Sequence, residues 1–169
     1  MNVTKIYFDM DGVLANFEKG VRDMCGIDSY SQNEKRPSGY DEMMWQKVSG
    51  VEHFYDKLEV IPGALEMFNA VRNAYGDRCE ILTGIPKPHK GVPTAAEDKI
   101  AWTRRLLSKD IVIHTVYRAE KIEYCKGPDY ILIDDMKKTI KNWNELGGTG
   151  ILHVSPEETM GILREMGLL

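Results

Sequence analysis

The run VTKIYFDMDGVLA, residues 3–15, joins an apolar segment to two carboxylates and a glycine. Residues 3–8 are rich in β-branched and aromatic side chains, which is typical of a buried strand, and Gly12 permits a tight turn after it. Asp9 and Asp11 then fall at the carboxyl end of this strand, which is the edge at which open α/β sheets bind ligands. Taken by themselves, these residues also fit a plain acidic loop after a strand.

Composition limits the classes of protein that the chain can belong to. With 169 residues, 43% hydrophobic and 28% charged, it suits one well-cored domain with a small insertion, and no apolar run is long enough for a membrane span. The net charge of −4 argues against a nucleic-acid polymer as partner. No secretory signal is visible, so a cytoplasmic location is expected. Cys25, Cys79 and Cys125 are odd in number and lack metal-site spacing, which favours reduced thiols.

Strand patterns and helix patterns alternate along the remainder of the chain. Further strands are predicted at 79–84, 111–116, 130–135 and 151–154. Helices are predicted at 64–75, at 97–108, after Asp135 and at the end of the chain. This alternation predicts an α/β fold with a Rossmann-like, mostly parallel five-stranded sheet flanked by helices.

Residues 16–60 differ in character from the rest. Glycines and a proline divide them into short helical pieces, which predicts a small helical cap inserted after the first strand into a core of residues 1–15 and 61–169. The cap aromatics either form its own core or include a stacking surface for a planar ligand. These aromatics are Tyr30, Tyr40, Trp45, Phe54 and Tyr55.

A second unusual segment, residues 85–94, combines three prolines with Lys87, His89 and Lys90. Its composition predicts a loop without a helix. The loop is either a basic lip over the site or a solvated surface segment.

Polar residues follow several of the predicted strands, and parallel strands would bring them to one rim. They are Asp9 and Asp11, Thr83, a lysine at 121 or 126, and Asp134 and Asp135. Carboxylates placed together repel unless a cation neutralises them, and hard oxygen ligands suit Mg²⁺. A hydroxyl and an ammonium group would hold phosphate oxygens while one carboxylate attacks phosphorus, so the set predicts phosphoryl transfer. Asp134 and Asp135 also fit a simpler role as caps of the next helix.

These motifs, in this order, resemble those of the haloacid dehalogenase (HAD) superfamily: Asp9-Met10-Asp11-Gly12-Val13, Thr83-Gly84, a lysine, and Asp134-Asp135. The resemblance implies that Asp9 is the nucleophile and Asp11 the acid/base that marks phosphatases and mutases. It implies Mg²⁺ held by Asp9, the backbone carbonyl of Asp11 and Asp134, with Asp135 in support. Thr83 would donate to the phosphate.

Within that superfamily the chain looks most like the 5′(3′)-deoxyribonucleotidases and their bacterial and phage relatives. The likeness rests on residues 9–17, 58–64, 131–135 and 147–152. It implies that Phe17 contacts the base, that Lys121 rather than Lys126 is the phosphate lysine, and that Lys99 is a second substrate lysine. Gly84 stands where those enzymes commonly have serine.

The function expected from the residues and the resemblance together is a Mg²⁺-dependent phosphomonoesterase. Its substrate would be a small molecule, a nucleoside or deoxynucleoside monophosphate, hydrolysed through an aspartyl phosphate. One alternative is a phosphatase of another small phosphorylated metabolite. The other is a nucleotide-binding regulatory protein with little turnover.

Overall fold

The computed structural model describes residues 1–169 and contains one five-stranded sheet in the order β3-β2-β1-β4-β5. Its strands are β1 (Lys5–Phe8), β2 (Cys79–Gly84), β3 (Ile113–Val116), β4 (Tyr130–Asp134) and β5 (Thr149–Leu152). All four neighbouring pairs are parallel, which confirms the predicted α/β class. The fifth strand starts two residues earlier than predicted because β4 already pairs with it at Ile131↔Thr149.

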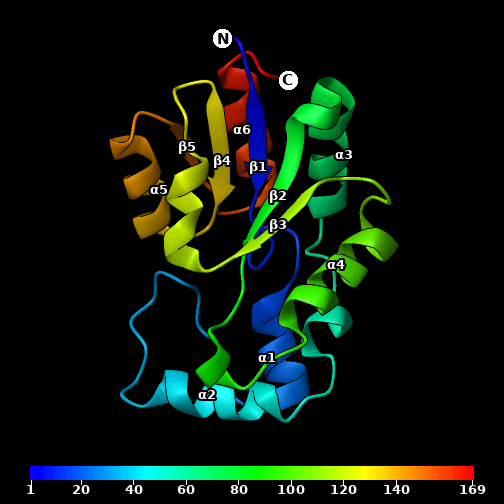
Figure 1. Ribbon diagram of the computed structural model, residues 1–169, viewed down its shortest axis with the longest axis vertical. Coiled ribbons are helices and arrows are strands. Elements are labelled where there is room, and N and C mark those ends of the chain that lie inside the picture. Colours follow the sequence, from blue (N-terminus) through cyan, green and yellow to red (C-terminus); the bar gives the residue numbers. More distant parts are fainter.

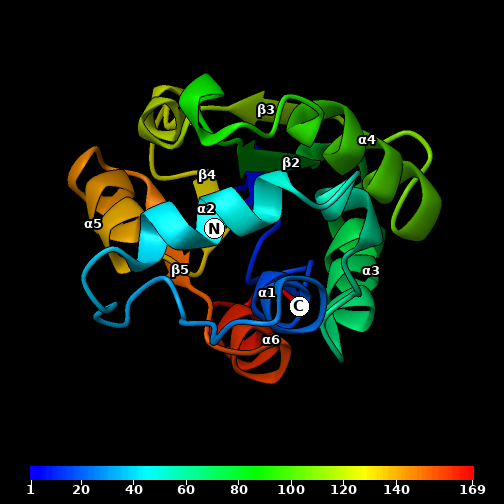
Figure 2. The same ribbon diagram turned by 90° about the horizontal axis from the view of Figure 1, so that it is seen from below.

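Alternation along the strands sends side chains into two separate cores. Ile6 and Phe8 of β1 face the larger core, beneath α3 (Ala64–Tyr75) and α6 (Pro156–Glu165). Tyr7 faces the smaller one, which α5 (Lys137–Glu145) and the 3-10 helix η4 (Arg118–Tyr124) cover. Figure 2 shows these helices on the two sides of the sheet. The central strand is therefore buried on both faces, as parallel sheets require.

The cap segment lies at the carboxyl ends of the strands (Figure 1). It contains α1 (Phe17–Cys25), α2 (Tyr40–Ser49) and the 3-10 helix η1 (Phe54–Lys57). An isolated bridge pairs Ala15 with Val60, so the chain leaves and returns side by side. On the core side, the indole of Trp102 in α4 (Ala95–Leu106) donates to the Leu58 carbonyl at 2.7 Å. The cap therefore rests on α4 through buried polar contacts as well as apolar ones.

Residues 85–94 correct one prediction. They include a 3-10 turn, η3 (Pro88–Lys90), where no helix was expected. Proline is compatible with a first helical position because its missing N–H would have no partner there. The Lys90 ammonium lies 5.7 Å from the ring centroid of Trp45 in α2, while Lys87 and His89 are exposed. Lys90, the partly buried basic side chain of this segment, therefore packs against the cap.

Histidines and cysteines occupy structural or surface positions. His114 pairs with Glu80 at 2.6 Å, His153 with the Thr159 hydroxyl at 2.7 Å, and His53 with Asp98 at 2.8 Å. All three cysteines are free thiols. No helix has both the length and the apolar character needed to cross a membrane.

Candidate active site

The sheet order places the acidic residues together. β1 pairs with β4 in register, Phe8 opposite Ile133, so Asp9 and Asp134 are the next residues on neighbouring strands. The chain leaves β1 toward β2 and leaves β4 toward β5, on opposite sides. Such a reversal of direction opens a crevice at the strand ends, where ligands bind in open α/β sheets.

Three carboxylates form a compact cluster in this crevice. Ligand oxygens of Asp9, Asp134 and Asp135 lie within 4.8 Å of one another. Gly12 adopts a φ of +80°, and a Cβ there would stand 2.0 Å from the Asp135 Oδ2, so the turn after β1 needs glycine. Burial, followed by the charges of Asp9 and Asp134, raises the pKa of Asp135 to about 9. Burial and Asp9 likewise raise the pKa of Asp134. The cluster carries more negative charge than its surroundings compensate.

Lys121 is the cation inside this cluster. Its ammonium is 2.8 Å from the Asp9 Oδ1 and 2.8 Å from the Asp134 Oδ2, and the residue is 4% exposed. Burial by itself would lower the pKa of Lys121, but the two carboxylates outweigh it and raise the pKa. Lys126, the competing candidate, is exposed. The geometry thus favours Lys121 as the lysine of the site.

A second buried lysine holds Asp11. Lys99, in α4, has no exposed surface, and its ammonium donates to the Asp11 Oδ2 at 2.8 Å, the Thr83 Oγ1 at 2.9 Å and the Gly84 carbonyl at 2.7 Å. An ammonium has three hydrogens, so these acceptors use all of them. Lys99 therefore contacts the acid/base candidate, while its expected contact with substrate stays a prediction.

Two other predicted site residues, Thr83 and Asp11, are in contact with Lys99. Thr83 is fully buried and accepts from Lys99, which leaves its own hydroxyl proton to donate. The Asp11 Oδ1 is buried without a hydrogen-bond partner. An unpaired buried carboxylate oxygen is costly, so a proton or a donor group at this position would be stabilising. Asp11 thus has one oxygen fixed and one available.

The N-cap residue of α5 is Met136, whose side chain makes no capping bond, so the expectation that Asp134 or Asp135 caps this helix is wrong. The Asp134 Oδ1 instead accepts from the backbone N–H of Met136 at 2.8 Å, just before α5, while the Asp134 Oδ2 accepts from Lys121. The bond to Met136 therefore uses one carboxylate oxygen and leaves the other in the cluster.

A cleft of about 510 Å³ opens next to the acids. Its lining includes Asp11 and Asp135, Phe17 and Tyr30 of the cap, and Asn33. Phe17 is only 8% exposed, because its ring also packs against Trp45, Phe54 and Tyr55. Phe17 thus belongs mainly to the larger hydrophobic core, although it also lines the cleft.

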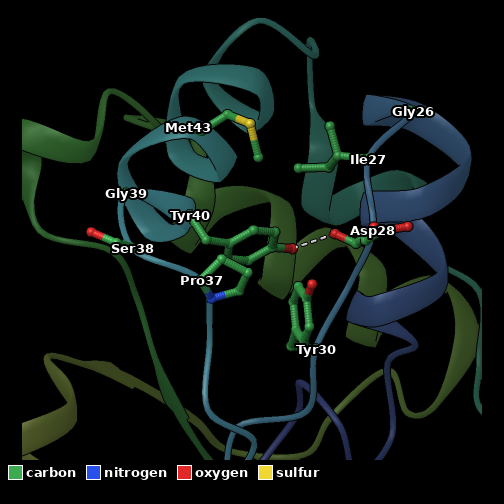
Figure 3. A pocket seen from close by; sticks show the side chains of 9 residues that line it. All are labelled: Gly26, Ile27, Asp28, Tyr30, Pro37, Ser38, Gly39, Tyr40 and Met43. Atoms are coloured by element: carbon green, nitrogen blue, oxygen red, sulfur yellow. Dashed lines mark hydrogen bonds between the residues drawn. The ribbon is translucent and has the colours of Figure 1, made fainter.

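A second cavity, of about 520 Å³, lies within the cap and apart from the acids (Figure 3). Tyr30 and Tyr40 meet there edge to face with centroids 4.9 Å apart, and the Tyr40 hydroxyl donates to the Asp28 carbonyl at 2.5 Å. Tyr40 and Phe54 are buried in the larger hydrophobic core, which continues from the sheet into the cap.

Two residues of the site were not singled out from the sequence. The Tyr55 ring lies 4.6 Å from the Lys99 ammonium, and burial followed by the Asp11 charge raises the pKa of its hydroxyl. Asn33 bonds to the backbone around Met136. Tyr55 was visible only as one of several cap aromatics, and no local pattern marks Asn33.

The acidic cluster suits a divalent cation. Three carboxylates face a single ammonium, and burial, followed by the charges of the neighbouring carboxylates, raises the pKa values of Asp134 and Asp135. All the available donors are hard oxygens, which is the ligand type that Mg²⁺ prefers. Asp9, Asp134 and Asp135 can each offer one carboxylate oxygen as a ligand.

Comparisons with known proteins identify the fold of the chain. No protein-family model matches the sequence. No curated protein matches it either. Among solved structures, a HAD family hydrolase from Deinococcus radiodurans R1 with bound phosphate and sodium aligns over 99% of this chain and 97% of its own, at 15% identity and a TM-score of 0.51.

Two further solved structures are similar to this chain over nearly its whole length. A Bacillus subtilis HAD-hydrolase bound to magnesium covers 96% of this chain and 99% of its own, at 13% identity and a TM-score of 0.56. A dehalogenase with an intermediate complex covers 95% and 97%, at 9% identity and a TM-score of 0.60. The chain therefore has the fold of HAD-family hydrolases.

Proposed function

We propose that the protein is a Mg²⁺-dependent phosphomonoesterase that works through a phosphorylated Asp9. One observation carries the proposal: two carboxylates from one turn stand in different environments. Asp9 belongs to the acidic cluster with Lys121, whereas Asp11 is held apart by Lys99. Acid/base and nucleophilic roles are commonly divided between carboxylates in this way.

In the first step, an oxygen of Asp9 attacks phosphorus and the bond from phosphorus to the ester oxygen breaks. Asp11 gives its proton to the departing alkoxide, which leaves as an alcohol. The Thr83 hydroxyl and Lys121 hold the phosphate oxygens on which charge develops. We assign this proton transfer to the Asp11 Oδ1, because this oxygen has no hydrogen-bond partner in the protein.

In the second step, water attacks phosphorus of the aspartyl phosphate. Asp11, now ionised, takes a proton from that water, and the bond from phosphorus to Asp9 breaks. The products are inorganic phosphate and the original carboxylate. Lys99 keeps Asp11 at the same place in both steps, because its three bonds to Asp11, Thr83 and Gly84 fix the ammonium.

Mg²⁺ would be held by Asp9, Asp134 and the Asp11 carbonyl, with Asp135 supporting its water ligands. When bound, it would offset the charge of the phosphate and of the acids. The chain supplies Lys121 as a permanent cation beside the same two carboxylates.

As substrate class we propose nucleoside or deoxynucleoside monophosphates. The resemblance of residues 9–17 and 58–64 to deoxyribonucleotidases supports this choice. So do the Phe17 and Tyr30 side chains that line the cleft beside Asp11, because aromatic rings pack against bases. A phosphatase of another small metabolite would use the same chemistry with a leaving group that lacks a base.

Dehalogenases share the fold, and the position of Asp11 separates the two chemistries. Displacing a halide needs no proton for the leaving group, whereas an alkoxide does. A carboxylate held by the buried Lys99 two residues after the nucleophile therefore favours phosphate esters.

The proposal is tested by phosphate release from ribo- and deoxyribonucleoside monophosphates and sugar phosphates, with Mg²⁺ or with chelator, alongside Asp9→Asn. We expect Mg²⁺-dependent hydrolysis of nucleotides and none by the variant, because an amide is a poor nucleophile. Faster hydrolysis of baseless phosphates would keep the mechanism and reject the nucleotide. Nucleotide binding without any release would indicate a regulatory protein.

A further inference from the structure

Residues 27–39 connect α1 to α2 and rise from the cap toward α5 (Figure 1). Two of their side chains hydrogen-bond to the core. Gln32 accepts from Arg118 at 3.4 Å, a long and exposed bond. Asn33 makes two shorter bonds, and both reach the turn that follows β4. The connection is therefore attached to the core mainly through Asn33.

Asn33 completes the first turn of a helix that is remote in sequence. Its Nδ2 donates to the Asp135 carbonyl at 2.7 Å, and its Oδ1 accepts from the backbone N–H of Lys137 at 2.9 Å. Lys137 is the first residue of α5, and the preceding Met136 gives this helix no side-chain cap. The first N–H groups of a helix need such acceptors. The cap segment thus supplies the acceptor that α5 lacks.

The same turn carries Asp134 and Asp135, two of the three acids of the cluster. The Asp134 Oδ1 accepts from the Met136 N–H, while Asn33 holds the groups on either side of Met136. Asp135 packs against Gly12 so closely that no Cβ fits between them. A turn fixed from both sides sets the separation of the Asp134 and Asp135 carboxylates, and a small change in it alters the cation site.

We infer that Asn33 is a positioning residue that couples docking of residues 27–39 to cation binding by Asp9 and Asp134. The inference rests on the proposed Mg²⁺ site. Partners that orient metal ligands commonly affect metal affinity strongly. Such coupling is reciprocal: docking raises the affinity for Mg²⁺, and Mg²⁺ strengthens docking by the same factor.

Titration calorimetry of the full chain with Mg²⁺ alone tests the first half. Asn33→Ala is expected to weaken Mg²⁺ binding about tenfold, the lower end for such partners because Asn33 is exposed. Gln32→Ala, on the same segment but bonded to Arg118 instead, is the matched control and should bind Mg²⁺ like the wild type. Asn33→Gln, which is one methylene too long for both bonds, should behave like the alanine variant.

Hydrogen exchange of the metal-free and Mg²⁺-loaded chain tests the second half. Mg²⁺ should slow exchange in residues 27–39 of the wild type and leave it unchanged in Asn33→Ala. If the wild type binds Mg²⁺ and both Asn33 variants bind it equally well, the coupling is wrong and the proposed function stands. If the wild type binds no Mg²⁺, the proposed function and the coupling are both wrong.

Discussion

The site has two halves, one around Lys121 and one around Lys99. Each half pairs a buried lysine with aspartate, but the balance of positive and negative charge differs between them. Around Lys121, one ammonium is shared by Asp9 and Asp134, and Asp135 adds a further carboxylate. Around Lys99, one ammonium meets one carboxylate and two neutral oxygens. The first half is short of positive charge, whereas the second is balanced.

This difference separates the two kinds of chemistry. A cluster with excess negative charge attracts a divalent cation and the phosphate that comes with it. A balanced pair holds one carboxylate in place and leaves its other oxygen, the Asp11 Oδ1, for a proton. Each half can therefore be changed separately, and the consequences should differ in kind.

The largest effects are expected for two variants, one of which should lose turnover and the other Mg²⁺ binding. Asp11→Asn should lower turnover by about 10²–10⁴-fold, because it removes the general acid/base. Asp134→Asn should instead weaken Mg²⁺ binding by more than about 100-fold, beyond what loss of a supporting partner causes. Calorimetry and single-turnover kinetics on both variants would measure this. Equal loss of Mg²⁺ affinity in the two variants would remove the distinction between the halves.

Lys121→Ala should lower turnover by about 10²–10³-fold, the usual effect of losing one charged donor to a developing oxyanion. Lys126→Ala is the control, because that side chain is exposed and makes no contact with the acids. Steady-state kinetics at saturating Mg²⁺ would compare them. A larger loss in Lys126→Ala would assign the phosphate lysine to the other residue.

Lys99→Met should destabilise the protein by about 3 kcal/mol, because it leaves Asp11 without its buried cation. Denaturant unfolding would give the free energy, with Lys126→Met as an exposed control. A second substitution, Asp11→Asn in the Lys99→Met background, should recover most of the loss, since the orphaned charge is then absent. No recovery would mean that Lys99 acts through packing.

Asp135→Asn should stabilise the metal-free protein by about 2 kcal/mol near pH 8. The folded-state pKa of Asp135, about 9, lies above its ordinary value of 3.8, so the folded chain binds the extra proton between these values and its stability falls as pH rises through that window. Thermal unfolding in chelator at pH 4 and pH 8 would measure the effect. The gain should vanish at pH 4, and a gain of equal size at both pH values would contradict the electrostatic cause.

Much of the fold follows from the sequence because the buried strands are short apolar runs that end in glycine or acids. The runs before Asp9 and before Asp134 were placed correctly by this pattern. Strand ends shifted where pairing outweighed composition, as at Thr149. The turn at Pro88 was missed because proline stops a helix in its interior and not at its start.

The site was less predictable where contacts cross between elements. The strand pattern alone left a lysine at 121 or 126, and the resemblance favoured Lys121, which is the buried residue of η4. Lys99 was named for a substrate contact, but its place on the buried side of α4 brings its ammonium to Asp11. Asn33 bonds to a turn about a hundred residues away, and no periodicity or local motif reports such a bond.

The most direct measurement asks whether Asp9 becomes phosphorylated. Asp11→Asn protein would be mixed with Mg²⁺ and an aryl phosphate, whose phenolate leaves without a proton from Asp11, then quenched in acid and digested, and the peptide containing residue 9 weighed by mass spectrometry. Because this variant lacks the group that activates water, we expect that peptide to carry one phosphoryl group, and Asp9→Asn to carry none. An unmodified residue 9 during active turnover of the wild type, or a phosphoryl group on another residue, would contradict the mechanism.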